Sequence, residues 1–238
     1  MQLAFAKTKS CDVCPIRHRA VCASCNPDEL AVLDSIKTYR TFEAGQPILF
    51  AEDRMSFVGS VVFGTATLEQ MLEDGRKQTL GLLLPSDFIG RPGRERAPYN
   101  VMAITDVTLC CFEKRKFEEL IASTPHISQR LLEMSLDELD AARDWMLLLG
   151  RKTAREKIAT FLVMIEKRTS DPRDGQGIVA RRIELPLTRE AMADYLGLTI
   201  ETVSRQFTAL KKEGVIALEG KRGVVIPDLP RLTEIAGF

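Results

Sequence analysis

The sequence predicts an α+β protein built from an N-terminal β-barrel or jelly roll, one long helix and a C-terminal winged helix-turn-helix domain. Three observations carry this prediction. Short apolar runs separated by turns fill the chain from Ile36 to Phe112. Apolar residues then recur in steps of three and four between Pro125 and Gly150, and two amphipathic helices meet at Gly197.

The predicted barrel consists of short strands at regular spacing. Residues 57–63, 78–84 and 101–104 form apolar or alternating runs. Turn signals at residues 44–47 (AGQP) and 73–76 (EDGR) separate them, and the second is a strong hairpin signal. Many short strands punctuated in this way are typical of a closed or double-layered β domain.

The long helix carries an apolar seam like that of a coiled coil. A short helix over residues 116–123 precedes it. The side of the helix expected to face the barrel carries Leu131, Met134 and Leu136. A second apolar face is left over, and it predicts a partner helix and therefore a homodimer. The small residues Ser135 and Ala142 make the seam weak, as suits a dimer that can be switched. The predicted interface is Leu132, Ser135, Leu139, Ala142, Met146 and Leu149.

After a helix over residues 152–168 and a loop over 170–177, the chain reads as a helix-turn-helix. Thr188 and Thr199 are expected N-caps, and Gly197 lies where the chain must turn with positive φ. The buried stripes are Met192, Tyr195 and Leu196 on the first helix and Val203, Phe207 and Leu210 on the second. The outward residues at the start of the second helix are Glu201, Thr202, Ser204 and Arg205. In a recognition helix this end reaches base edges in the major groove.

A small hairpin follows the second helix. Residues 215–218 and 223–226 flank a Glu-Gly-Lys-Arg turn, which predicts the wing of a winged helix. Lys221 and Arg222 at its tip are expected to contact phosphates of double-stranded DNA.

The composition is that of a globular protein, with 45% hydrophobic and 28% charged residues. No apolar run has membrane length and the N-terminus lacks a signal-peptide core, so we expect a cytoplasmic protein without a membrane partner. The formal net charge is zero, yet from Arg151 onward 16 Lys and Arg residues stand against 12 Asp and Glu. This asymmetry favours nucleic-acid binding by the C-terminal part alone.

The N-terminal segment is rich in cysteine: Cys11, Cys14, Cys22 and Cys25 fall within fifteen positions. In a reducing cytoplasm such a cluster favours a metal over a disulfide. Thiolates bind both zinc and iron–sulfur clusters, and a further ligand can come from the adjacent Cys110 and Cys111. Because neighbouring strand residues point to opposite faces, at most one of these two is expected to be a ligand.

The order of barrel, long helix and winged helix, with residues 187–210, closely resembles the CRP/FNR superfamily of bacterial transcription regulators. The cysteine cluster resembles the FNR branch, the oxygen-sensing anaerobic regulators, and its Cys-x2-Cys-x7-Cys spacing is similar to the alphaproteobacterial form. This resemblance implies that Cys11, Cys14, Cys22 and Cys110 bind a [4Fe–4S] cluster. Cys25 is an alternative to Cys22, and Cys111 raises the same question about Cys110.

The resemblance also implies how DNA is read and what is not bound. Glu201, Ser204 and Arg205 match the Glu-x-x-Ser-Arg with which the family reads TTGAT half-sites, and RNA polymerase is the implied protein partner. Arg205 can donate twice to guanine, and Glu201 can accept from cytosine. No cyclic nucleotide is expected, because the phosphate-binding residues of the CRP branch are replaced by Gly90-Arg91-Pro92 and Ala97-Pro98-Tyr99.

We therefore divide the chain into a cysteine-rich cluster-binding segment (1–27), a β-barrel sensor domain (28–124), a dimerisation helix (125–150) and a winged helix-turn-helix DNA-binding domain (151–238). The expected function is oxygen-responsive transcription regulation through a cluster-controlled dimer. A zinc- or thiol-based redox regulator on the same scaffold is the main alternative, and a constitutive DNA binder is another. An iron–sulfur enzyme or electron carrier is not predicted, since His18 and His126 are the only histidines and no second cofactor motif or catalytic set is evident.

Overall fold

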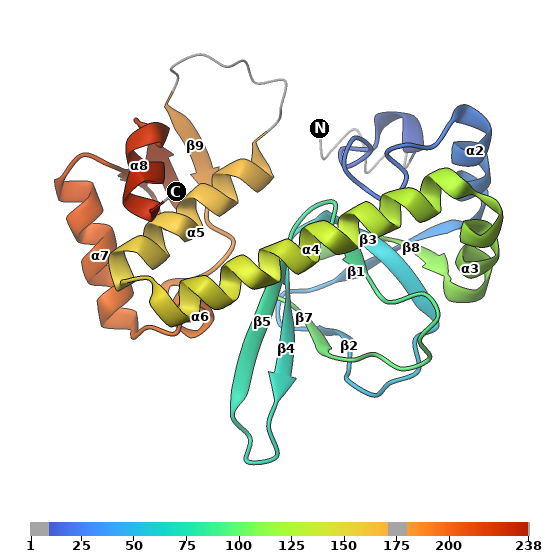
Figure 1. The fold of residues 1–238 in the computed structure, drawn as a ribbon, viewed down its shortest axis with the longest axis horizontal. Helices are drawn as coiled ribbons and strands as arrows, with labels where there is room; N and C mark the ends of the chain where they lie inside the picture. Colours follow the sequence, from blue (N-terminus) through green and yellow to red (C-terminus); the bar gives the residue numbers. More distant parts are fainter. Residues whose placement is uncertain (1–9, 171–179, 238) are drawn as a thin grey trace. The chain divides into compact units, whose positions relative to one another are not determined.

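The computed structural model describes residues 10–170 and 180–237 (Figure 1). The chain divides between Ala141 and Ala142 into two compact units. Beyond Ser170, the predicted loop over residues 170–177 lies outside the described residues. Within the described part of the chain, no helix is both long enough and apolar enough to cross a membrane.

The first unit contains the predicted jelly roll, made of two four-stranded sheets. One sheet has the strand order β1-β8-β3-β6 and the other β2-β7-β4-β5. Neighbouring strands are antiparallel throughout. The strands are β1 (Lys37–Phe42), β2 (Pro47–Leu49), β3 (Phe57–Phe63), β4 (Ala66–Met71), β5 (Lys77–Leu83), β6 (Phe88–Ile89), β7 (Asn100–Ala103) and β8 (Val107–Glu113).

The hydrophobic core of the barrel lies between these two sheets. Alternation sends Val61 of β3 and Leu109 of β8 inward, where they meet Ala66 and Val101 of the opposite sheet. Strand β3 is also buried on its other face, because helices and the N-terminal segment cover it. Burial on both faces explains why residues 57–63 read as one continuous apolar run rather than as an alternating pattern.

Three helices lie against the outer face of the β1-β8-β3 sheet (Figure 1). They are α2 (Pro27–Ile36), α3 (Lys114–Ser123) and the first part of α4 (Pro125–Arg151). Phe117 of α3 is fully buried, with its ring centroid 5.4 Å from that of Phe112. Helix α2 was not predicted, although Asn26 and Glu29 form the reciprocal hydrogen bonds of a capping box.

Helix α4 has the predicted apolar face, with one correction. Leu131 and Met134 pack toward the sheet as expected. Leu136 does not: it is 52% exposed, because its position on the helix lies outside the stripe that reaches α2 and α3. All of the predicted interface residues are exposed except Leu149, which is half-buried.

The second unit contains the winged helix-turn-helix. Helices α6 (Arg189–Leu196) and α7 (Ile200–Lys212) are capped by Thr188 and Thr199 as predicted, and Gly197 joins them with φ 60°. Strands β10 (Ala217–Glu219) and β11 (Gly223–Ile226) form the wing, and β9 (Arg181–Glu184) pairs with β11. The remaining helices are α5 (Ala154–Thr169) and α8 (Leu229–Ala236). Neither β9 nor α8 was predicted.

Buried side chains fix the two helices of this motif. The predicted stripes on both helices are buried. Arg189 lies over the Phe207 ring at 3.2 Å from its centroid, which ties the start of α6 to α7. The buried ammonium of Lys157 donates to the Leu196 carbonyl at 3.1 Å and satisfies the end of α6.

Candidate functional site

Three side chains from adjacent strands form a row across the outer face of the first sheet. Strand β8 lies between β1 and β3, and Cys110 is paired with Tyr39 on one side and with Ser60 on the other. Directly paired residues of antiparallel strands project to the same face with their Cβ atoms about 5 Å apart. The sheet register therefore places a thiol between two hydroxyl groups.

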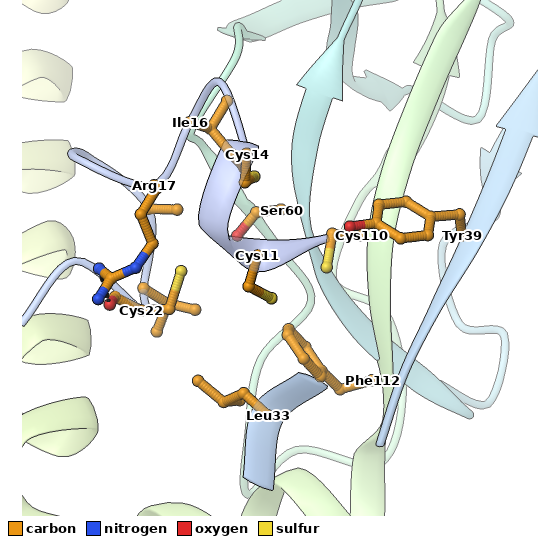
Figure 2. Close-up of a pocket in the computed structure, with 12 residues that line it drawn as sticks. Cys11, Cys14, Ile16, Arg17, Cys22, Leu33, Tyr39, Ser60, Cys110 and Phe112 are labelled. Atoms are coloured by element: carbon orange, nitrogen blue, oxygen red, sulfur yellow. Dashed lines mark hydrogen bonds between the residues drawn. The ribbon is translucent and has the colours of Figure 1, made fainter. Parts of the chain in front are cut away.

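The N-terminal segment lies over this row and brings three more thiols to it. A short helical turn, η1 (Cys11–Val13), begins the segment. Figure 2 shows Cys11, Cys14 and Cys22 on this segment around the same pocket as Cys110 of strand β8. All four predicted cluster ligands thus line one pocket, although Cys110 is 88 positions or more from the others in sequence.

Apolar contacts hold the segment on the sheet, and one arginine holds its loop together. Ile16 and Ala20 are buried against Val62, and Val21 is buried beside Val58. The guanidinium of Arg17 closes the loop from within: it donates to the carbonyls of Cys22, of Ala23 at 2.8 Å and of Cys25 at 3.0 Å.

The two remaining cysteines occupy different places. Cys25 is buried in the hydrophobic cluster beneath α2 and α4, and it does not line the pocket. Cys111 belongs to the core between the two sheets, as strand alternation predicts. The surroundings of these two thiols are apolar, so each has the environment of a buried structural cysteine.

Burial keeps the pocket thiols protonated. It raises the pKa of Cys11 to about 12, to which a hydrogen bond with Asp34 contributes, while Lys37 opposes the rise. Burial also raises the pKa of Cys14, Cys22 and Cys110 above the ordinary value. Arg17 and Lys37 favour the thiolate forms of Cys14 and Cys22. Because metals bind thiolates, occupation of this site would release protons.

The space between the four thiols is small. It measures about 20 Å³, room for about one water molecule. Among the described residues, no three His, Cys, Asp or Glu side chains are arranged to hold a single metal ion.

Three polar residues of the pocket were not predicted from the sequence: Arg17, Tyr39 and Ser60. Arg17 lies between Cys14 and Cys22, but so does Arg19, so the sequence signals a cation among the thiols without showing which arginine it is. Tyr39 and Ser60 are far from the cysteines in sequence, and only the strand register brings them beside Cys110.

The predicted base-reading residues lie together at the start of α7. Glu201, Ser204 and Arg205 are exposed, and Thr202 is half-buried. A hydrogen bond from its own backbone N–H, together with one from Thr199, holds the pKa of Glu201 below its usual value. The carboxylate is therefore available as an acceptor at neutral pH, which is what a cytosine amino group requires.

The predicted phosphate contacts lie at the turn of the wing. Lys221 is exposed and Arg222 is half-buried. The backbone carbonyl of Arg222 accepts from Leu185 at 2.9 Å, and an ion pair between Arg182 and Glu219 links β9 to β10. These contacts fix the wing while its two basic side chains extend from the turn.

Two protein families match this chain. Residues 39–124 match the family described as the cyclic nucleotide-binding domain. Residues 156–235 match the family described as the Crp-like helix-turn-helix domain. The first range covers most of the jelly roll together with α3, and the second runs from α5 to α8.

Known proteins similar over most of this chain are regulators. The transcriptional activator protein FnrL of Cereibacter sphaeroides is 61% identical over 227 residues, which are 95% of this chain and 92% of FnrL. The nitrogen fixation regulation protein FixK of Bradyrhizobium diazoefficiens is 39% identical, over 87% of this chain and 86% of FixK. The solved structure of FixK2 from Bradyrhizobium japonicum has a TM-score of 0.75 at 30% identity, covering 84% of this chain and 97% of that one.

The exposed arginine of α7 can be tested as a base reader. If Arg205 is bidentate to guanine, Arg205→Ala should cost about 1–3 kcal/mol of discrimination per half-site. The measurement is an anaerobic titration at fixed salt against a TTGAT-type palindrome and a second duplex with that guanine changed in both half-sites.

Lys221→Ala is the control, because loss of a phosphate contact should weaken binding to both duplexes equally and reduce the salt dependence. If Arg205→Ala still prefers the guanine by the wild-type margin, another residue reads that base.

Proposed function

The chain belongs to the FNR branch of the CRP/FNR family of transcription regulators, and we propose that it is an oxygen-responsive activator whose cysteine pocket binds a [4Fe–4S] cluster. One observation carries this proposal. The four cysteines at the family spacing, Cys11, Cys14, Cys22 and Cys110, line a single pocket, while the two extra cysteines lie outside it.

The donor set fits an iron–sulfur cluster. Four thiols are the usual ligands of a [4Fe–4S] group. Here a short segment of fifteen residues supplies three of them. Lys37 donates to the Cys11 sulfur at 3.3 Å, and Arg17 favours the thiolates of Cys14 and Cys22. These cations offset the negative charge that four thiolates bring into an apolar pocket. When bound, the cluster supplies an oxygen-labile tie among the four sulfurs.

The segment that carries three ligands also contacts the helix that carries the dimer seam. Arg130 of α4 donates to the Arg19 carbonyl at 2.7 Å, and its Nε is buried without a partner. His126 of α4 lies 2.9 Å from the Glu29 carboxylate of α2. A shift of the segment therefore changes contacts of α4 directly, which gives a physical route from the pocket to the seam.

Dimerisation then sets DNA affinity. The exposed face of Leu132, Leu139 and Met146 is an apolar stripe that a second copy of α4 would bury. Two half-sites held by one dimer bind far more tightly than either does alone, so a modest change in the dimer equilibrium changes promoter occupancy. Activation would follow from contact between the bound dimer and RNA polymerase.

Cyclic nucleotides are not the proposed signal, although the barrel matches a family named for them. Ala97 is buried, and its backbone N–H is already paired with Asp53 at 2.9 Å. Pro98 has no N–H to offer a phosphate. The segment that aligns with the phosphate-binding residues of the CRP branch therefore has few donors.

A zinc- or thiol-based regulator is the alternative on this scaffold, because zinc also binds four thiolates. Metal analysis separates the two: bound zinc without iron and acid-labile sulfide would favour the alternative. The wild-type protein, purified under argon, should instead contain iron and sulfide, absorb in the visible range and lose that absorbance in air.

Alanine substitutions test the ligand set, since alanine leaves no unpaired hydroxyl in an apolar site. Cys11→Ala, Cys14→Ala, Cys22→Ala and Cys110→Ala should each lose iron, sulfide and anaerobic DNA binding, because a site missing one thiolate binds weakly. Cys25→Ala and Cys111→Ala are matched controls that should retain all three. Iron loss from Cys25→Ala together with iron retention by Cys22→Ala would show that the third ligand is misassigned.

The seam is tested by placing a charge on it. Leu139 is 45% exposed, so Leu139→Asp should fold, yet the charge would be buried against its twin in a dimer. Anaerobic sedimentation should therefore show a monomer. Leu80→Asp is the matched control, because Leu80 is 39% exposed but belongs to strand β5 and not to the predicted seam of α4. An unchanged dimer in Leu139→Asp would remove this face of α4 from the interface.

A further inference from the structure

Ser60 presents a buried hydroxyl that has no hydrogen-bond partner. The residue is 2% exposed, and its Oγ is one of two buried side-chain polar atoms without a partner among the described residues. Buried hydroxyls are nearly always paired, because an unpaired one has lost its bonds to water without replacement. The serine therefore destabilises the chain as it stands.

The position itself favours an apolar residue. Ser60 lies on the outer face of β3 between Val58 and Val62, which share that face and are completely buried. A β-branched apolar side chain would suit this strand and leave no polar atom unsatisfied. Local structure thus gives no reason for a hydroxyl here.

The hydroxyl lies at the cysteine pocket. Ser60 lines that pocket and is the direct strand partner of Cys110. Figure 2 shows its oxygen among Cys11, Cys14 and Cys110. On the other side of Cys110, burial and, to a smaller extent, a hydrogen bond between the Tyr39 and Cys110 side chains raise the pKa of the Tyr39 hydroxyl. Tyr39 is thus already paired, while Ser60 has a free O–H facing the place where sulfur would be bound.

We propose that the Ser60 hydroxyl donates a hydrogen bond to sulfur of the bound iron–sulfur group and thereby slows its oxidation by dioxygen. This inference rests on the proposed function. In the oxidation, one electron leaves the site and dioxygen takes it up as superoxide. A hydrogen bond to sulfur stabilises the negative charge of the more reduced state, so it raises the reduction potential and makes that electron harder to remove.

Ser60→Ala and Ser60→Thr separate the hydrogen bond from packing. In full-length protein purified under argon, Ser60→Ala should lose its visible absorbance in air roughly two- to tenfold faster than wild type, with a lower midpoint potential. Ser60→Thr keeps the hydroxyl and should stay close to wild type in both measurements.

Urea unfolding of the full-length chain after iron removal provides a readout of opposite sign. Ser60→Ala should unfold at the same or a higher urea concentration than wild type, because it removes an unpaired buried hydroxyl. Thr67→Val is the matched control: Thr67 is buried in β4 and donates to Glu69 at 2.8 Å, outside the pocket. That variant should unfold earlier and lose absorbance in air at the wild-type rate.

The outcomes distinguish this inference from the proposed function. If wild type contains no iron and sulfide after anaerobic reconstitution, both are wrong. If wild type is loaded and loaded Ser60→Ala matches it in air-loss rate and potential, only the role of Ser60 is wrong. Equally fast loss of absorbance in air by Ser60→Ala and Ser60→Thr would also overturn that role, because the hydroxyl would then make no difference.

Discussion

The pairing of strand β8 between β1 and β3 is the constraint on which the cysteine site depends. This register places Cys110 on the outer face, opposite Tyr39 and Ser60, and sends Cys111 into the core. A slip of one residue would exchange the two thiols between faces. The register is well specified, because the inward residues of all three strands are packed against the second sheet.

The N-terminal segment adds the remaining thiols by a different kind of contact. It joins no sheet, and buried apolar side chains set its place against β3. Arg17 stabilises the loop internally, because its guanidinium binds three carbonyls of the same segment. Because none of its residues belongs to a strand of the barrel, the segment is the part of the site that the proposed function assigns to the response. In the proposed function, its hydrogen bond from Arg130 would couple a change in the segment to α4.

Periodicity and capping residues predicted the helix-turn-helix and the wing, because short local patterns determine both. The jelly roll was predicted as a class, but β1, β2, β4 and β6 were not found individually, since their residues are only partly apolar. Helix α8 and strand β9 were also missed. Alternation predicted that Cys110 and Cys111 face opposite sides of the sheet, and the family resemblance indicated Cys110 as the ligand. The neighbours Tyr39 and Ser60 depend on long-range strand pairing. Leu136 was wrongly predicted to face the barrel, because the sequence does not show how wide a strip of the helix the neighbouring elements cover.

In the proposed function, the state of the cysteine pocket controls DNA binding. The most direct measurement compares the DNA affinity and sedimentation of one anaerobic preparation before and after exposure to air, at fixed salt, on a TTGAT-type palindrome. Affinity should fall and the dimer should dissociate as visible absorbance is lost. Equal affinity under argon and in air, with absorbance lost, would show a constitutive DNA binder and contradict the claim.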